Sequence, residues 1–175
     1  MPLIPVVIRS LLEGEIDLVA RCLPFDAMTP PGRHREYFQM QQRGEAVCLI
    51  AWLAGRPVGH ALVRWAGTWT YPMASELKAC PHLSALVVAP EYRSRGIGSQ
   101  LMETAEEMAL QRGYQQIGLS VGTDNDRAQA LYVRRGYRDA GFDASRKRRR
   151  YLDEAGRERF FEEVSVYLIK PLYVE

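Results

Sequence analysis

The sequence predicts an α/β fold in which a mixed β-sheet is covered by about four helices. Three observations favour this fold class. Along the chain, the apolar residues switch repeatedly between a period of two, typical of strands, and a period of 3.6, typical of helices. Two apolar runs at residues 46–53 and 57–65 flank Ala54-Gly55-Arg56, a pattern typical of an antiparallel hairpin. Farther along, a helical segment at residues 96–112 connects two strand segments, as in a βαβ unit with parallel strands.

These periods also place the individual elements. The expected helices cover residues 13–23, 33–43, 96–112 and 126–135. The expected strands cover residues 6–9, 46–53, 57–65, 83–88, 115–121, 137–142, 148–152 and 159–170. The clearest helix, at residues 96–112, has an apolar stripe and is followed by Gly113, a residue type that commonly ends helices. The strand at residues 83–88 contains no charged residue, which indicates that both of its faces are covered.

Length and composition limit the class of protein. The 175 residues fit one domain, so we expect residues 1–175 to fold as a single unit. Hydrophobic residues make up 47% and charged residues 25%, as in soluble globular proteins. The net charge of +2 is too small to indicate nucleic acid as the default partner. The longest apolar run, residues 46–54, is far shorter than the ~20 residues of a membrane span, so we expect no membrane insertion.

The start of the chain and its cysteines indicate the compartment. Residues 1–5 lack the basic segment of a secretory signal, and Glu13 follows soon afterwards. Cys22, Cys48 and Cys80 are odd in number, are widely spaced and do not have the spacing of zinc ligands. We therefore expect reduced thiols, a cytoplasmic protein and no metal site.

The junction between the strand at residues 83–88 and the next helix indicates an anion-binding site. Gly96, Gly98 and Ser99 open the helix, where backbone N–H groups are unpaired and the helix dipole is positive. Such a helix start suits a pyrophosphate, and Arg93 and Arg95 add positive charge. The segment matches neither a Walker A loop nor a Rossmann fingerprint, since the lysine of the first and the third glycine of the second are missing.

A second segment, residues 120–137, reads as the end of a strand, a capped helix and a glycine stop. Asp124 or Asn125 can cap this helix. Tyr132 lies about two turns into the helix, on the side of Ala128 and Leu131. We therefore expect Tyr132 to point toward the sheet rather than into solvent.

Together, these two segments resemble the central motifs of the GNAT superfamily of N-acetyltransferases. The resemblance rests on residues 86–98, residues 125–132 and Arg135-Gly136-Tyr137, and it extends from Leu83 to Arg138. It implies a mostly antiparallel sheet of about seven strands with a central, splayed parallel pair. It also implies acetyl-CoA as co-substrate and transfer of an acetyl group to an amine.

The resemblance assigns roles to individual residues. A bulge in the strand at residues 83–88 would expose backbone groups of Leu86 and Val88 to the pantetheine amides. A backbone N–H near Val87 or Val88 would stabilise the oxyanion. Asn125 would contact the pantetheine arm, and Tyr132 would protonate the departing thiolate. The pyrophosphate would be held by Arg93 or Arg95 and by the backbone amides of six residues: Ser94, Arg95, Gly96, Ile97, Gly98 and Ser99.

The general base stays open at this point. Many relatives carry a carboxylate where this chain has Ser84, and others carry one where it has Ser120. Glu76 and His82 are the remaining side-chain candidates, since a histidine titrates near neutral pH. Deprotonation through ordered water requires no named residue.

Several functions are compatible with these residues. The first is transfer of acetyl from acetyl-CoA to the primary amine of a small molecule by direct attack in a ternary complex; a protein N-terminus or lysine is the alternative acceptor. A non-catalytic acetyl-CoA-binding module is a different class, and RNA binding through the basic residues Arg146–Arg150 is another. Acidic residues follow across the predicted hairpin, as on a solvated face of opposite charges. The resemblance leaves a homodimer open.

Overall fold

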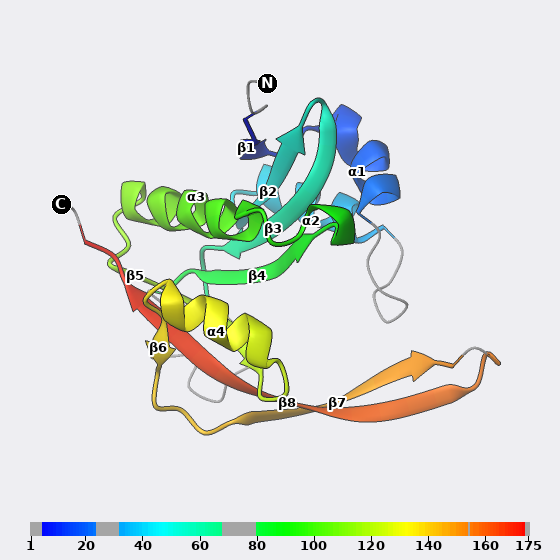
Figure 1. Ribbon diagram of the computed structural model, residues 1–175, viewed down its shortest axis with the longest axis vertical. Helices are drawn as coiled ribbons and strands as arrows, with labels where there is room; N and C mark the ends of the chain where they lie inside the picture. Colours follow the sequence, from blue (N-terminus) through cyan, green and yellow to red (C-terminus); the bar gives the residue numbers. More distant parts are fainter. Residues whose placement is uncertain (1–4, 24–31, 68–79, 154, 174–175) are drawn as a thin grey trace.

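The computed structural model describes residues 5–23, 32–67, 80–153 and 155–173 (Figure 1). These residues form an eight-stranded sheet in the order β1-β2-β3-β4-β5-β8-β6, with β7 paired to β8 beside this path. The strands are β1 (Val7–Ser10), β2 (Ala46–Leu53), β3 (Arg56–Arg64), β4 (His82–Val88), β5 (Gln116–Gly122), β6 (Arg138–Asp139), β7 (Ser145–Leu152) and β8 (Glu158–Pro171). The helices are α1 (Ile16–Cys22), α2 (Arg33–Gln42), α3 (Ile97–Gln111) and α4 (Asp126–Arg134). The expected fold class is therefore confirmed, and the sheet has the eight strands that the periods predicted, where the resemblance implied about seven.

Three predicted elements differ from the structure. The strand expected at residues 148–152 begins three residues earlier, at Ser145, because its pairing with β8 extends to Ser165. The helix expected at residues 13–23 begins as a 3-10 turn at Glu13–Glu15 and becomes α-helical only at Ile16. The strand expected at residues 137–142 is reduced to Arg138–Asp139. It ends there because Gly141 adopts a φ of +78° and its N–H donates to Oδ1 of Asp139 at 2.7 Å, which closes a turn.

The helices cover the two faces of the sheet, and the alternation of side chains along each strand separates two cores. On the α2 face, Ile50 and Leu62 pack with residues of α1. On the α3 face, Leu49 and Val63 pack with Leu101 and its neighbours in α3. Side chains of α4 join this second core, so α3 and α4 lie on the same face.

The two parallel strands separate after a short pairing. β4 and β5 pair only through His82–Gly118 and Leu83–Leu119. Beyond this point β4 contains a bulge, because one more residue separates Ser84 from Val87 than separates their partners on β3. Ala85, within the bulge, has a left-handed φ of +50°. The expected bulge and splayed pair are thus confirmed.

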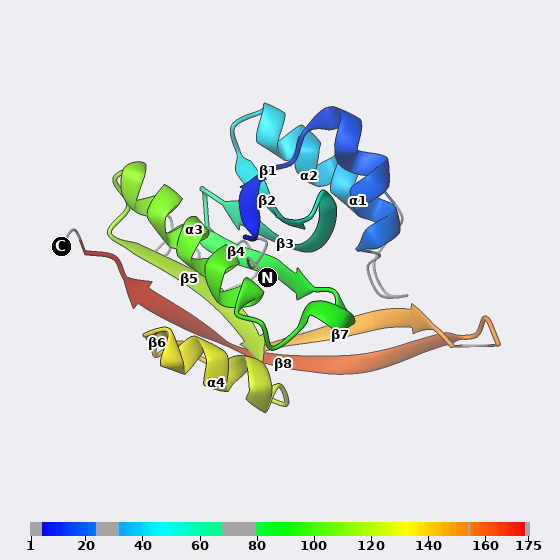
Figure 2. The same cartoon turned by 45° about the horizontal axis from the view of Figure 1, so that its top comes forward.

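The β7–β8 ribbon extends away from the rest of the described residues in both views (Figures 1 and 2). β8 is 14 residues long, so its second half pairs with β5 while its first half pairs only with β7. None of the helices in the described ranges is long and apolar enough to cross a membrane.

Candidate active site

A cavity of ≈ 650 Å³ opens on the α3 face, beside the place where β4 leaves β5. Three segments line it: the end of β4, the loop and first turn of α3, and the first two turns of α4. The structure brings eleven of the twelve predicted site residues to this cavity. They are Leu86, Val87, Val88, Arg93, Ser94, Gly96, Ile97, Gly98, Ser99, Asn125 and Tyr132.

The two predicted phosphate-binding arginines lie differently. Arg93 lines the cavity, and its Nε donates a hydrogen bond to the carbonyl of Val88 at 3.0 Å. Arg95 does not line the cavity; its guanidinium lies 5.4 Å from the centre of the Tyr92 ring, at the distance of a cation–π contact. The backbone on both sides of Arg95 is left-handed, with φ of +61° at Ser94 and +79° at Gly96, and the Arg95 side chain is exposed.

The start of α3 presents backbone donors to the cavity. Gly96 precedes the helix in a left-handed conformation, and no side chain caps the helix start. Gly98 follows in the first turn, and a Cβ built there would meet only a methyl of Val88, at 3.8 Å. The amides of this turn are therefore uncovered, as an anion site requires.

Asn125 caps α4 at the opposite wall of the cavity. Its Oδ1 accepts a hydrogen bond from the N–H of Ala128 at 3.1 Å. Arg127, in the first turn, donates from a guanidinium nitrogen to Oγ of Ser94 at 3.1 Å and so links α4 to the loop before α3. This cap is one of the two roles expected for Asn125. Its contact with the cofactor stays a prediction.

Sequence reasoning did not assign five of the cavity residues: Tyr92, Arg127, Ala128, Leu131 and Arg134. Four of these lie on α4, within the same two helical turns as Tyr132. The helical spacing that placed Tyr132 toward the sheet could have located Ala128 and Leu131, which lie on the same side of α4, but not the two arginines.

Tyr132 lies half-buried in the second turn of α4. Its ring centre lies 6.1 Å from that of Tyr137, which fixes one side of the ring. Burial raises the pKa of Tyr132, because a phenolate would lose its hydration there. The side chain is therefore a neutral phenol at physiological pH and holds a proton that it can donate into the cavity.

His82 is buried at the start of β4, on the α2 face. Its ring stacks on Tyr167 with centres 5.7 Å apart, and Nδ1 lies 3.3 Å from the Tyr167 hydroxyl. Burial, together with the charges of Arg64 and Lys147, lowers the pKa of His82 to about 3. Such an imidazole accepts a proton poorly near pH 7, which argues against His82 as the base. The other named candidate, Glu76, lies outside the described residues.

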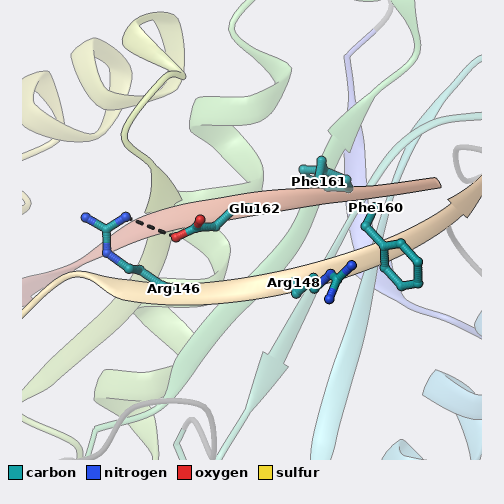
Figure 3. Close-up of a pocket in the computed structure, with 5 residues that line it drawn as sticks. All are labelled: Arg146, Arg148, Phe160, Phe161 and Glu162. Atoms are coloured by element: carbon teal, nitrogen blue, oxygen red, sulfur yellow. Dashed lines mark hydrogen bonds and ion pairs between the residues drawn. The ribbon is translucent and has the colours of Figure 1, made fainter.

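The basic segment at Arg146–Arg150 forms strand β7, and acidic residues face it from β8, as the sequence predicted. Three of its arginines make ion pairs: Arg146–Glu162 at 3.0 Å, Arg149–Glu163 at 2.6 Å and Arg150–Glu158 at 2.5 Å. Figure 3 shows the first of these pairs, with Arg148 beside Phe160; the Arg148 guanidinium lies 4.1 Å from the centre of that ring. Much of the positive charge is therefore balanced within the ribbon.

Trp65 opens the connection between β3 and β4. It is buried on the α3 face, stacked on Tyr114 with ring centres 6.1 Å apart and covered by the guanidinium of Arg112. Its role in the described structure is packing. Trp69, Tyr71 and Pro72 of the same connection lie outside the described residues.

The splayed sheet and its cavity define an α/β fold that solved acetyltransferases share. The PaiA N-acetyltransferase of Thermoplasma acidophilum, solved in complex with coenzyme A, superposes with a TM-score of 0.64 over 95% of this chain and 99% of that one. The two sequences are 14% identical, so this likeness shows the fold alone. Residues 16–137 match the acetyltransferase (GNAT) family. The chain belongs to this family, which confirms the resemblance.

Two relatives illustrate the sequence similarity. The thialysine N-epsilon-acetyltransferase of Bos taurus is 34% identical over 95 residues, which cover 53% of this chain and 55% of the relative. The aminoalkylphosphonate N-acetyltransferase of Salmonella typhimurium is 32% identical over 136 residues, which cover 77% of each. The chain thus spans about half the length of the bovine relative.

Proposed function

We propose that the chain is an acetyl-CoA-dependent N-acetyltransferase whose acceptor is the primary amine of a small molecule. The observation that carries this proposal is the cavity, which combines the free edge of β4, the uncapped start of α3 and the phenol of Tyr132. The names of the two relatives support a small acceptor, since thialysine and aminoalkylphosphonates are small amines.

The residues of the cavity fit the parts of acetyl-CoA. The amides at the start of α3, with Arg93 and Arg127 nearby, suit the diphosphate. Because β5 pairs with β4 only as far as Leu83, the backbone beyond the bulge is free to pair with the pantetheine amides like an added strand. The Val88 carbonyl accepts a hydrogen bond from the Arg93 Nε–H with one lone pair. Its second lone pair can accept a hydrogen bond from a pantetheine amide.

The reaction then needs a positioned oxyanion donor and an acid. Bound acetyl-CoA supplies an activated thioester carbonyl. A backbone N–H near Val87 or Val88 donates to the oxyanion that forms when the neutral amine attacks this carbon. The C–N bond forms, the C–S bond breaks, and the Tyr132 hydroxyl gives its proton to the departing sulfur. Burial raises the pKa of Tyr132, so the phenol is protonated before the transfer, and the phenolate left afterwards regains a proton from water.

The proton lost by the amine passes to water in this proposal. Ser84 and Ser120 have no carboxylate to accept it, and His82 is buried with a pKa of about 3. Transfer through ordered water to bulk solvent fits an amine that deprotonates before attack. Glu76 remains the side-chain alternative for this step.

Two measurements test the function. Titration calorimetry with acetyl-CoA should show saturable binding, and a panel of primary amines should include acceptors that release coenzyme A. The same assay with lysine-containing peptides and free peptide N-termini tests the protein-acceptor alternative. Tight binding with no release across all acceptors would indicate a binding module, and the absence of any binding would refute the proposal.

A further inference from the structure

We propose that the acceptor amine carries a negatively charged group, a carboxylate or a phosphonate, which Lys147 binds on the α2 face of the sheet. This inference rests on the proposed function and names the class of its acceptor. It begins with a difference among the five basic residues of β7.

Lys147 is the one half-buried residue in this basic run, whereas the four arginines are exposed. The arginines each have an acidic or aromatic partner on β8. Lys147 lies opposite Glu163, but the carboxylate of Glu163 is paired with Arg149 at 2.6 Å. Within the described ranges, Lys147 makes no ion pair. Its ammonium is therefore available to an anion, and its partial burial strengthens that attraction.

The pairing register places Lys147 on the α2 face. Ser145 lies opposite Ser165, and side chains alternate along both strands, so Lys147 shares a face with Ser165 and Tyr167. Tyr167 stacks on His82.

Electrostatic interactions connect Lys147 with the same part of the sheet. The charges of Arg64 and Lys147 both contribute to the lowered pKa of His82. Burial, Arg149 and Arg64 lower the pKa of Lys147, and Glu163 opposes them. Lys147 is thus within electrostatic reach of Arg64 and His82 as well as of its neighbours on the ribbon. An anion bound here would be attracted by Lys147 and Arg64, with Glu163 opposing.

This face is also the one from which an amine can reach the thioester. The cavity for the carrier opens on the α3 face, where α3 and α4 lie. Ser84 and Ser120 begin the separated parts of β4 and β5, and the register places both on the α2 face, with Leu62 and Tyr167. An acceptor that enters between the separated strands from this side meets the carrier with its amine end while its other end lies toward β7.

Matched pairs of amines test the charge requirement. β-Alanine is compared with β-alaninamide, and 2-aminoethylphosphonate with ethanolamine, in the coenzyme A release assay. The charged member of at least one pair should have a kcat/KM about tenfold higher or more, since hydrogen bonds to charged groups are stronger than those to neutral groups. The carboxylate and phosphonate arms show which anion is preferred.

Variants assign this preference to Lys147. Lys147→Gln should raise the KM of the charged acceptor about tenfold, with little change for its neutral partner or for acetyl-CoA binding. Lys147→Arg should retain most of the preference. Arg148→Gln is the matched control, since Arg148 is on the opposite face of the ribbon, over Phe160, and should leave all values unchanged.

The outcomes separate the two proposals. If the unaltered chain does not bind acetyl-CoA, the proposed function itself is overturned. Three outcomes would overturn the charged acceptor alone, provided that acetyl-CoA binds. They are equal or better use of the neutral amines, acetylation of neither member of any pair, and an equal effect of Lys147→Gln on both members of a pair.

Discussion

The hydroxyl of Tyr137 donates a hydrogen bond to Oε1 of Glu106, 3.1 Å away. Glu106 is a buried carboxylate on α3, and Tyr137 follows α4. The other oxygen of Glu106 accepts from Lys170 of β8 at 2.5 Å and from Arg135 at 3.4 Å. One carboxylate thus connects α3, the end of α4 and β8, the elements that hold the walls of the cavity in place.

Glu106→Ala should therefore destabilise the protein strongly. Removing one member of a buried ion pair typically lowers the free energy of unfolding by about 3–5 kcal/mol, because the remaining charge stays buried without a partner or water. Urea unfolding should show a loss of about 3 kcal/mol. Glu103→Ala is the control. Glu103 is exposed and its ion pair with Arg135 is long, at 3.8 Å, so this substitution should lower the free energy of unfolding by less than about 0.5 kcal/mol. Equal effects of the two substitutions would contradict this assignment.

Gly98→Ala should separate stability from cofactor binding. The added Cβ meets only a Val88 methyl at 3.8 Å, an ordinary contact, and alanine favours a helix more than glycine does. We expect the unfolding free energy to stay constant or rise by up to about 1 kcal/mol. The methyl nevertheless stands before the amides that we propose for the diphosphate, so the Kd for acetyl-CoA should rise at least tenfold. Unchanged affinity by calorimetry would count against the diphosphate position.

Tyr132→Phe should impair turnover and leave binding intact. General acid catalysis typically contributes 10²–10⁴-fold, so kcat should fall by about a hundredfold or more while the Kd for acetyl-CoA changes little. Tyr173→Phe, at an exposed tyrosine far along the chain, is the control and should behave as the unaltered enzyme does. Retained kcat in Tyr132→Phe would exclude the phenol as the acid. A preformed, unreactive thioether analogue of acetyl-CoA could confirm that the variant's cavity is intact.

Much of the fold and of the cavity could be predicted because local patterns determine them. The period of 3.6 in α3, the glycines before and within its first turn, and the cap at Asn125 are all short-range signals, and each one is present in the structure. The bulge and the splayed strands came from the family resemblance. Their physical basis, the left-handed Ala85 and the early end of the β4–β5 pairing, depends on partners far apart in the sequence.

The features that could not be predicted depend on tertiary packing. Arg95 does not line the cavity but contacts Tyr92, in a loop whose flanking residues Ser94 and Gly96 are left-handed. The short β6 results from the turn at Gly141, although its sequence suits a longer strand. The difference between Lys147 and the arginines beside it arises from the length of β8 and from which carboxylates face each position. Sequence spacing alone treats the five basic residues as equivalent.

The three buried histidines should make stability depend on pH. His34, His60 and His82 are between 1% and 5% exposed, and burial, as the largest cause, lowers their pKa values to about 4, about 3 and about 3. The unfolded chain binds protons at these positions near pH 6.5, so the unfolded state gains protons first as the pH falls. The free energy of unfolding should therefore decrease below pH 6.5.

The expected loss between pH 7 and pH 5 is about 2 kcal/mol for each histidine that stays neutral in the folded state. Urea unfolding at half-unit steps measures this slope. His60→Gln should reduce the dependence of the free energy of unfolding on pH by the contribution of about one proton, whatever it does to the stability at pH 7. The carboxylate of Glu15, whose pKa is lowered by its pairing with Arg9, contributes a loss only at more acidic pH, below the carboxyl pKa of the unfolded chain. A flat profile between pH 7 and pH 5 would mean that these imidazoles can be protonated without unfolding, and that the burial of His82 does not keep it from acting as a base.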